Sequence, residues 1–102
     1  MVHEFKYPYR YEKKIIEDWN SKAIGVYYCG VLAPGGKLTL YYIGSAVGED
    51  GIRGRLLDHL GEDKWHDVTH FGYHVCDTEK EALDHEASEI FKYKPKYNTQ
   101  GK

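Results

Sequence analysis

Two tyrosines at matching points of neighbouring segments are the first residues that could do chemistry. Tyr27 ends the stretch GVY, and Tyr42 begins the stretch YIG. The surrounding segments AIGVYYCGVL and KLTLYYIG are rich in strand formers, and the turn residues APGG separate them. This pattern predicts a β-hairpin over roughly residues 23–44 that carries both tyrosines.

The hairpin register decides whether the two tyrosines meet. A four-residue loop places Tyr27 directly opposite Tyr42, and a two-residue loop places them diagonally. Both registers put the rings on one face of the sheet, together with Gly25 and Gly44, which leave open space beside them. The alternative to a site is an aromatic pair that only stabilises the sheet.

A helix is expected directly after the hairpin, in GEDGIRGRLLDHLG, with Asp50 as its N-cap and Gly61 at its end. Arg55 and His59 lie one turn apart on the same edge of its apolar stripe, whereas Arg53 lies beyond the opposite edge. The stripe consists of Ile52, Leu56 and Leu60. Boundary charges on an ordinary amphipathic helix are the simpler interpretation.

Glu86 stands out because it lies on the apolar face of a predicted helix. It is four residues from Ala82 and from Ile90, and three from Leu83. A buried carboxylate must be paired, metal-bound or protonated. Two accounts follow: a structural ion pair with Arg55, or a divalent cation, since hard cations prefer carboxylate oxygen.

These stretches together resemble the GIY-YIG nuclease superfamily over about residues 23–98. GVY and YIG resemble its paired motif, with Val26 in place of isoleucine. RLLDH resembles its arginine helix, and EASEIFKYKPKYN resembles its closing segment. The loop SAVGEDG looks longer than usual, which leaves Arg53 as a second candidate for the family's arginine. Arg55 is preferred because RLLDH then supplies the histidine.

The resemblance implies an endonuclease that hydrolyses phosphodiester bonds, with DNA rather than RNA as the expected substrate. Glu86 would hold one Mg²⁺ or Mn²⁺, and Arg55 would clamp the nonbridging phosphate oxygens. Tyr27 would be the general base. Because free tyrosine has a pKa of about 10, it would need His59, Arg55 and the metal as cationic neighbours.

Further roles follow from the same resemblance. Tyr42 would hold water or phosphate through its hydroxyl, and Asn98 would pin the C-terminal segment onto the site. Tyr27, Tyr42, Arg55, His59 and Glu86 are expected to converge on one cleft. Phosphate contacts are expected from the lysines near the C-terminus, unless these form a solvated helix end. These are Lys92, Lys94 and Lys96.

A second metal pattern was weighed on the last predicted strand. His70, His74 and Cys76 share one face in the pattern H-x₃-H-x-C. A fourth ligand for zinc is not evident, so a polar strand face is the preferred interpretation.

The remaining elements complete an α+β fold. A short helix is expected within residues 10–21 and a third strand near 68–76. The last helix begins with a Thr78–Glu81 capping box, and Pro95 stops it before a C-terminal tail. Residues 1–102 are thus expected to form one domain, in which helices flank a three-stranded antiparallel sheet.

Composition limits the partners. The formal net charge is −2, although residues 48–89 hold twelve acidic and four basic residues and residues 90–102 hold four lysines and no acid. A modest affinity for nucleic acid is expected, improved by a homodimer or an accessory protein. Two cysteines without a signal peptide and the lack of a membrane-length apolar run favour the cytoplasm. A catalytically inactive nucleic-acid-binding module and a structural protein are the rival classes.

Overall fold

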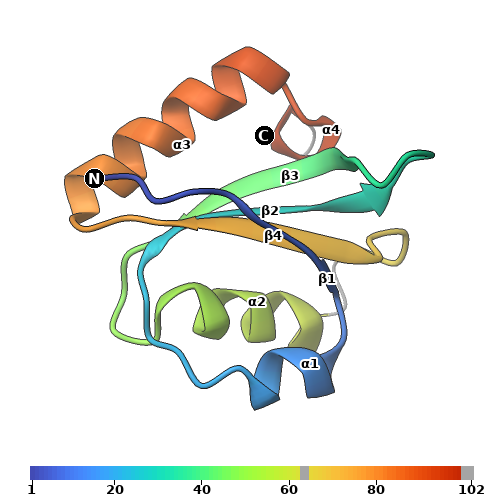
Figure 1. Ribbon diagram of the computed structural model, residues 1–102, viewed down its shortest axis with the longest axis horizontal. Coiled ribbons are helices and arrows are strands. Elements are labelled where there is room, and N and C mark those ends of the chain that lie inside the picture. Colours follow the sequence, from blue (N-terminus) through green and yellow to red (C-terminus); the bar gives the residue numbers. More distant parts are fainter. Residues whose placement is uncertain (63–64, 100–102) are drawn as a thin grey trace.

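The fold combines one β-sheet with helices on both of its faces (Figure 1). The structure is a computed structural model that describes residues 1–62 and 65–99. In chain order the elements are β1 (Lys6–Arg10), α1 (Lys13–Asp18), β2 (Gly25–Leu32), β3 (Leu38–Ala46), α2 (Gly51–Gly61), β4 (His70–Val75), α3 (Glu79–Tyr93) and α4 (Lys96–Thr99).

The sheet has four antiparallel strands in the order β1-β4-β2-β3, so the expected three-stranded sheet is wrong by one strand. The additional strand, β1, pairs with β4 along the outer edge. Its five residues are all exposed, so it shows no apolar alternation, and it contains Pro8. Proline is tolerated in edge strands, where its missing N–H is not needed. For these reasons the sequence pattern does not reveal it.

The hairpin of β2 and β3 follows neither expected loop length. Its last pair is Leu32 with Leu38, and the five-residue loop is closed by a hydrogen bond of 2.7 Å from the Ala33 N–H to the Lys37 carbonyl. Further along, Cys29 pairs with Tyr42 and Gly30 with Leu40, so Tyr41 is an extra residue in a β-bulge. Beyond the bulge the register is the one that places Tyr27 diagonal to Tyr42.

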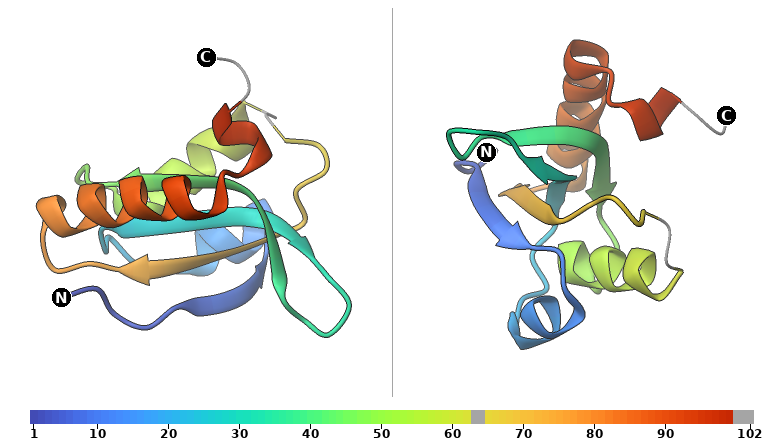
Figure 2. Two further views of the ribbon diagram at one scale, coloured as in Figure 1. Left: turned by 90° about the horizontal axis from the view of Figure 1, so that it is seen from above. Right: turned by 90° about the vertical axis from the view of Figure 1, so that its right-hand side faces the viewer.

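The two faces of the sheet are covered by different helices (Figure 2). On one face, α1 and α2 contribute Ile16, Ile52 and Leu56 to a core that includes Tyr27 and Phe71. On the other face, α3 contributes Ala82 and Ile90 to a second core. That core contains Val26, Tyr28, Ile43 and Cys76. Because successive strand residues point to opposite faces, Tyr27 and Tyr28 belong to different cores.

The helix ends agree only partly with the expected caps. The Thr78 hydroxyl accepts a hydrogen bond from the Glu81 N–H at 3.2 Å, as predicted for α3. Glu81 in turn bonds the N–H of Asp77, one residue earlier than a capping box requires. Asp50 makes no side-chain cap to α2, because the chain enters the helix through Gly51 at a φ of +64°.

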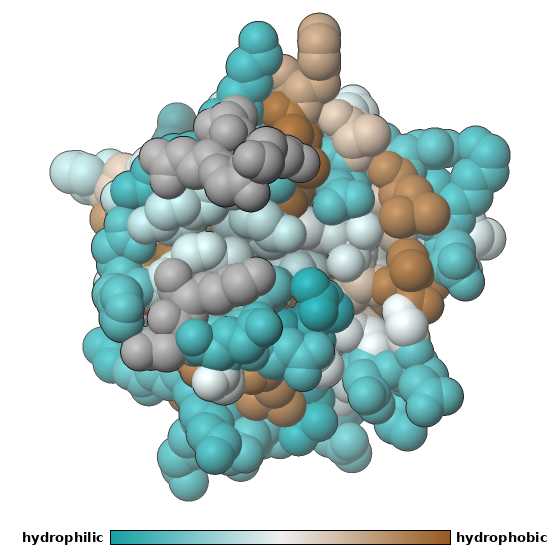
Figure 3. All heavy atoms as spheres, turned by 180° about the vertical axis from the view of Figure 1, so that it is seen from behind, coloured by the Kyte–Doolittle hydropathy of each residue, from teal (hydrophilic) through white to brown (hydrophobic). Residues whose placement is uncertain are grey.

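The C-terminal region is more ordered than the expected tail. Lys94 adopts a left-handed conformation that ends α3 before Pro95, and residues 96–99 then form the short α4. Residues 100–102 lie outside the described part. Within the described residues, no helix is both long and apolar enough to cross a membrane. Seen from behind, the surface is mostly hydrophilic, and its hydrophobic side chains form separate groups (Figure 3).

Candidate active site

A buried hydrogen bond between β2 and α2 forms the centre of the candidate site. The Tyr27 hydroxyl lies 2.8 Å from His59 Nε2, and each residue is 1% exposed. The histidine is therefore not at the boundary of the core, as its position beside the apolar stripe predicted, but inside it. The strand and the helix hold the two groups in a fixed relation that solvent does not disturb.

Gly44 explains how the tyrosine reaches this position. Residue 44 pairs with Tyr27 on β3, and a Cβ atom built there would lie 2.6 Å from the Tyr27 hydroxyl. A side chain at this position would have to displace the ring. Tyr42 lies diagonally beside Tyr27, with 6.1 Å between their ring centroids. The predicted association of the two tyrosines on one face is confirmed.

The structure separates the two candidate arginines. Arg55 lies close enough to Tyr27 and Tyr42 that its charge acts to lower the pKa of both phenols, while its Nη1 atom lies 3.5 Å from Asp58. The guanidinium of Arg53 instead donates to the Glu17 carbonyl at 3.1 Å, which ties α2 to α1. Arg55, which is about half exposed, is thus the arginine beside the tyrosines.

The environment of Tyr27 resists ionisation. Burial raises the pKa of Tyr27 well above its usual value, the neighbouring Tyr42 adds to this, and Arg55 opposes it. In the protein alone, the charge of Arg55 does not offset the effect of burial on this pKa. The expected lowering included the metal and stays a prediction. A neighbouring acceptor for the Tyr27 proton is present, because His59 Nε2 lies 2.8 Å from the hydroxyl.

Glu86 does not share the face of the tyrosines. Its carboxylate accepts a hydrogen bond of 2.9 Å from the Ser45 hydroxyl. Ser45 follows Ile43 by two residues on β3, and Ile43 packs in the core beneath α3. An arrangement in which all five residues act from one face of the sheet is excluded. The expected structural ion pair between Arg55 and Glu86 does not form either, because Arg55 lies next to Asp58 and Glu86 bonds Ser45.

Tyr42, on the edge strand β3, is affected by charges on both faces of the sheet. Burial raises the pKa of Tyr42, and the negative charge of Glu86 raises it further, while Tyr27 and Arg55 act to lower it. Tyr42 therefore senses the arginine on one side of the edge strand and the glutamate on the other.

Glu86 is also the group that could hold a metal here. It is half-buried, and Ser45 bonds one of its two oxygens. Mg²⁺ binds through one or two carboxylates, keeps several waters and is completed by substrate phosphate. One half-buried carboxylate beside the edge strand fits that requirement.

The predicted C-terminal residues divide into anchored and exposed groups. Asn98 bonds both backbone groups of Ile43, accepting from its N–H and donating to its carbonyl at 2.8 Å each. The Lys96 ammonium lies 3.0 Å from Asp67 and 3.9 Å from the centre of the Tyr41 ring. Lys92 and Lys94 are exposed, and their phosphate contacts stay a prediction.

Trp65 is a site residue that the sequence reasoning missed. Its ring lies 4.7 Å from that of Tyr42 and 4.5 Å from that of His59, measured between centroids. It stands in the segment between α2 and β4, where no periodicity marks it. Ser45 was missed as well, although its alternation with Ile43 would have placed it beneath the last helix.

Comparison of the chain with models of known protein families found no match, and neither curated proteins nor solved structures gave one. The resemblance to the GIY-YIG superfamily therefore depends on the sequence motifs alone.

Proposed function

We propose that this protein is a metal-dependent endonuclease of the GIY-YIG type, which hydrolyses phosphodiester bonds of nucleic acid, with DNA as the expected substrate. The observation that carries the proposal is the buried Tyr27–His59 hydrogen bond beside Arg55. Hydrolysis of a phosphodiester requires a base for the attacking water and a cation for the phosphate oxygens, and in this proposal the Tyr27–His59 pair is the base and Arg55 is the cation.

The base in this proposal is the Tyr27–His59 pair rather than a free tyrosinate. Because Tyr27 is 1% exposed, this mechanism requires that substrate binding admit a water to its hydroxyl. As that water attacks phosphorus, the Tyr27 oxygen takes its proton while the Tyr27 proton passes to His59 Nε2 over the 2.8 Å hydrogen bond. This transfer requires His59 to carry its own proton on Nδ1. It removes the need for a tyrosinate, which burial disfavours.

Arg55 and Glu86 act on the phosphate from the two sides of the β3 edge. The planar guanidinium of Arg55 suits bidentate contact with two nonbridging oxygens. Glu86 would bind Mg²⁺ or Mn²⁺, and the Ser45 hydroxyl, which donates to the Glu86 carboxylate, would orient it. When bound, the ion would offset the negative charge that develops on the phosphate and on the leaving oxygen. Trp65 and Tyr42 offer ring faces on which a base can stack.

The test is nicking of supercoiled plasmid in Mg²⁺ or Mn²⁺, with and without EDTA, for wild type and Glu86→Gln. Loss of one electrostatic stabiliser typically costs about 10²–10³ in rate, and loss of a metal ligand can cost more. Glu79→Gln, the same exchange at an exposed position of α3, is the matched control and should cleave normally.

Melting curves of the two variants separate catalysis from folding. Glu86→Gln should melt near wild type, because its hydrogen bond from Ser45 can persist with the amide oxygen. Full activity in EDTA, or normal nicking by Glu86→Gln, would refute the assignment. Plasmid binding without nicking in any divalent ion would instead establish the inactive binding module.

A further inference from the structure

A second group of polar side chains lies on the opposite face of the sheet, beneath α3. His74 of β4 and His85 and Glu89 of α3 each offer a ligand atom, and the three atoms lie within 4.8 Å of one another. All three residues are half-buried. They lie on the Tyr28 side of the sheet, so they form no part of the Tyr27 site.

The spacing of these atoms is close to that of a metal site. His85 Nε2 and Glu89 Oε1 are 3.5 Å apart. Zinc–ligand bonds of about 2.0–2.2 Å put neighbouring ligand atoms of a tetrahedron about 3.3 Å apart. The three ligand atoms lie within 4.8 Å of one another, so the longest of their separations would have to shorten by up to about 1.5 Å for one zinc ion to contact all three.

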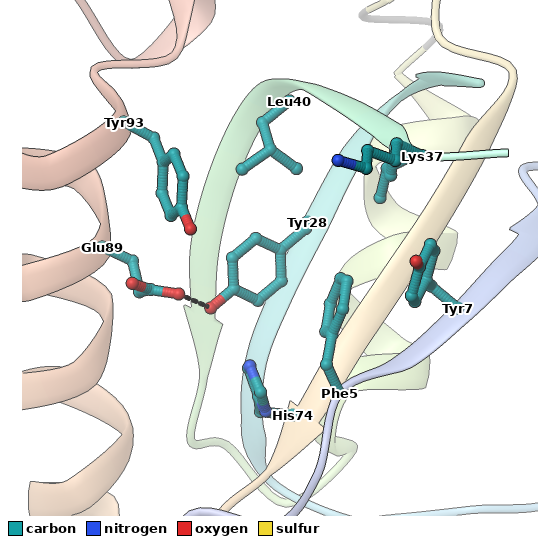
Figure 4. Close-up of a pocket in the computed structure, with 9 residues that line it drawn as sticks. Phe5, Tyr7, Tyr28, Lys37, Leu40, His74, Glu89 and Tyr93 are labelled. Atoms are coloured by element: carbon teal, nitrogen blue, oxygen red, sulfur yellow. Dashed lines mark hydrogen bonds between the residues drawn. The ribbon is translucent and has the colours of Figure 1, made fainter. Parts of the chain in front are cut away.

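The surrounding hydrogen bonds prepare the ligands for a cation. His74 Nδ1 lies 2.7 Å from the His3 carbonyl, which can only accept, so Nδ1 carries the proton and Nε2 keeps its lone pair. The Tyr28 hydroxyl donates to Glu89 Oε1 at 2.7 Å and fixes that carboxylate (Figure 4). The His3 carbonyl orients His74 from behind, as partners of metal ligands do. The Tyr28 hydroxyl instead lies between the other two ligand atoms, because it is also 3.3 Å from His85 Nε2, and it would move aside for a bound ion.

A cavity of about 550 Å³ opens beside this group. Tyr28, His74 and Glu89 line it together with the rings of Phe5, Tyr7 and Tyr93 (Figure 4). A bound cation would therefore have one side facing open space rather than protein. Zinc sites with three protein ligands and a fourth position left to water or substrate have this form.

We propose that His74, His85 and Glu89 bind one Zn²⁺ ion, with its fourth position open to this aromatic cavity. Two imidazole nitrogens and one carboxylate favour zinc or a similar transition metal over Mg²⁺, which prefers oxygen ligands. The site is independent of the proposed nuclease function.

The experiment is calorimetric titration of the metal-free full chain with Zn²⁺, and of His85→Gln, Glu89→Gln and the control His70→Gln. His70 lies on the same face of β4 but pairs with Gly30, four residues along the strand from His74. We expect one ion per chain for wild type and His70→Gln, and at least tenfold weaker binding for the other two variants. Wild-type melting should rise by about 5 °C or more in excess Zn²⁺.

Two measurements use the wild-type chain alone, so they do not depend on whether the variants fold. Co²⁺ bound to wild type should give the strong visible absorption of a four-coordinate site, and Zn²⁺ should shift the imidazole signals of His74 and His85 in wild-type NMR spectra. Absence of stoichiometric binding to wild type overturns the proposal. So does undiminished binding by folded His85→Gln and Glu89→Gln, or a loss of binding in His70→Gln.

Discussion

Two consecutive tyrosines of β2 are bound in parallel ways on opposite faces of the sheet. Tyr27 bonds His59 of α2, and Tyr28 lies 3.3 Å from His85 of α3. Burial raises the pKa of both phenols. They differ in the charge beside them, because Tyr27 faces the Arg55 guanidinium whereas Tyr28 donates to the Glu89 carboxylate.

This difference gives the two hydroxyls opposite roles. A cation next to a phenol favours loss of its proton, and a carboxylate that accepts its hydrogen bond holds the proton in place. Tyr27 is therefore suited to proton transfer, and Tyr28 is suited to orienting the Glu89 carboxylate. One strand thus carries two adjacent tyrosines whose hydroxyls meet different partners, and the helices that cover each face supply those partners.

The largest expected effect tests this contrast directly. Tyr27→Phe should slow plasmid nicking by about 10²–10⁴, because it removes the group that passes on the proton of the attacking water. Tyr28→Phe should nick at close to the wild-type rate. Rates are compared below the melting temperature of each variant. Equal loss in both variants, or activity retained in Tyr27→Phe, would show that the two tyrosines do not differ as proposed.

The arginines of α2 sharpen the comparison next. Arg55→Ala should lower nicking by about 10²–10³, since it removes the phosphate clamp, and should melt near wild type because this side chain is about half exposed. Arg53→Ala should keep its nicking rate and lose about 1 kcal/mol of stability with its bond to the Glu17 carbonyl. Nicking and urea unfolding measure the two effects, and the reverse pattern would identify Arg53 as the catalytic arginine.

Stability should respond to the Tyr28 hydroxyl even though cleavage does not. Tyr28→Phe leaves the Glu89 carboxylate, which is 15% exposed, without its donor. We expect a loss of about 1–3 kcal/mol in the free energy of unfolding, measured in urea. The control is Tyr93→Phe, since Tyr93 is exposed on the same cavity. Unfolding equal to wild type would show that this hydrogen bond contributes nothing net.

The smallest expected effect is on the pH dependence of stability, through the exposed carboxylate of Asp67 and its hydrogen bond from Tyr97. Tyr97 donates to Asp67 at 2.6 Å, and this bond, with that from Lys96, lowers the pKa of Asp67. The lowered pKa stabilises the fold above the unfolded value of about 4, and the stabilisation disappears as the pH falls through the folded value. Between pH 5 and pH 2, the melting temperature of Asp67→Asn should therefore fall slightly less than that of wild type. Identical pH profiles would contradict this.

Local patterns were enough to predict the arrangement around Tyr27. The alternation of strand residues placed Tyr42 and Gly44 on its face, and the helical phase put Arg55 and His59 on the edge of α2 that meets them. Spacing says which residues share a face, but not how deeply they are buried: it placed His59 at the boundary of the core, and the structure places it inside.

The relation between elements was not readable in the same way. The helical phase put Glu86 on the inner side of α3, but it does not say which face of the sheet α3 covers. β1 was missed because its exposed residues and Pro8 show no alternation. His85 and Glu89 were missed although their separation of four residues puts them on one side of α3. Their partner, His74, comes from a different element, which only the fold brings near.

Asn98 has a consequence for how copies of this chain meet. β3 is the last strand of the sheet, and an uncovered strand edge invites another chain to extend the ladder. The Asn98 amide occupies both the N–H and the carbonyl of Ile43, as the backbone of a neighbouring strand would. A second copy cannot add to β3 at this point without displacing the C-terminal segment, so Asn98 protects the protein from fibre-like growth along the edge where the substrate is proposed to bind.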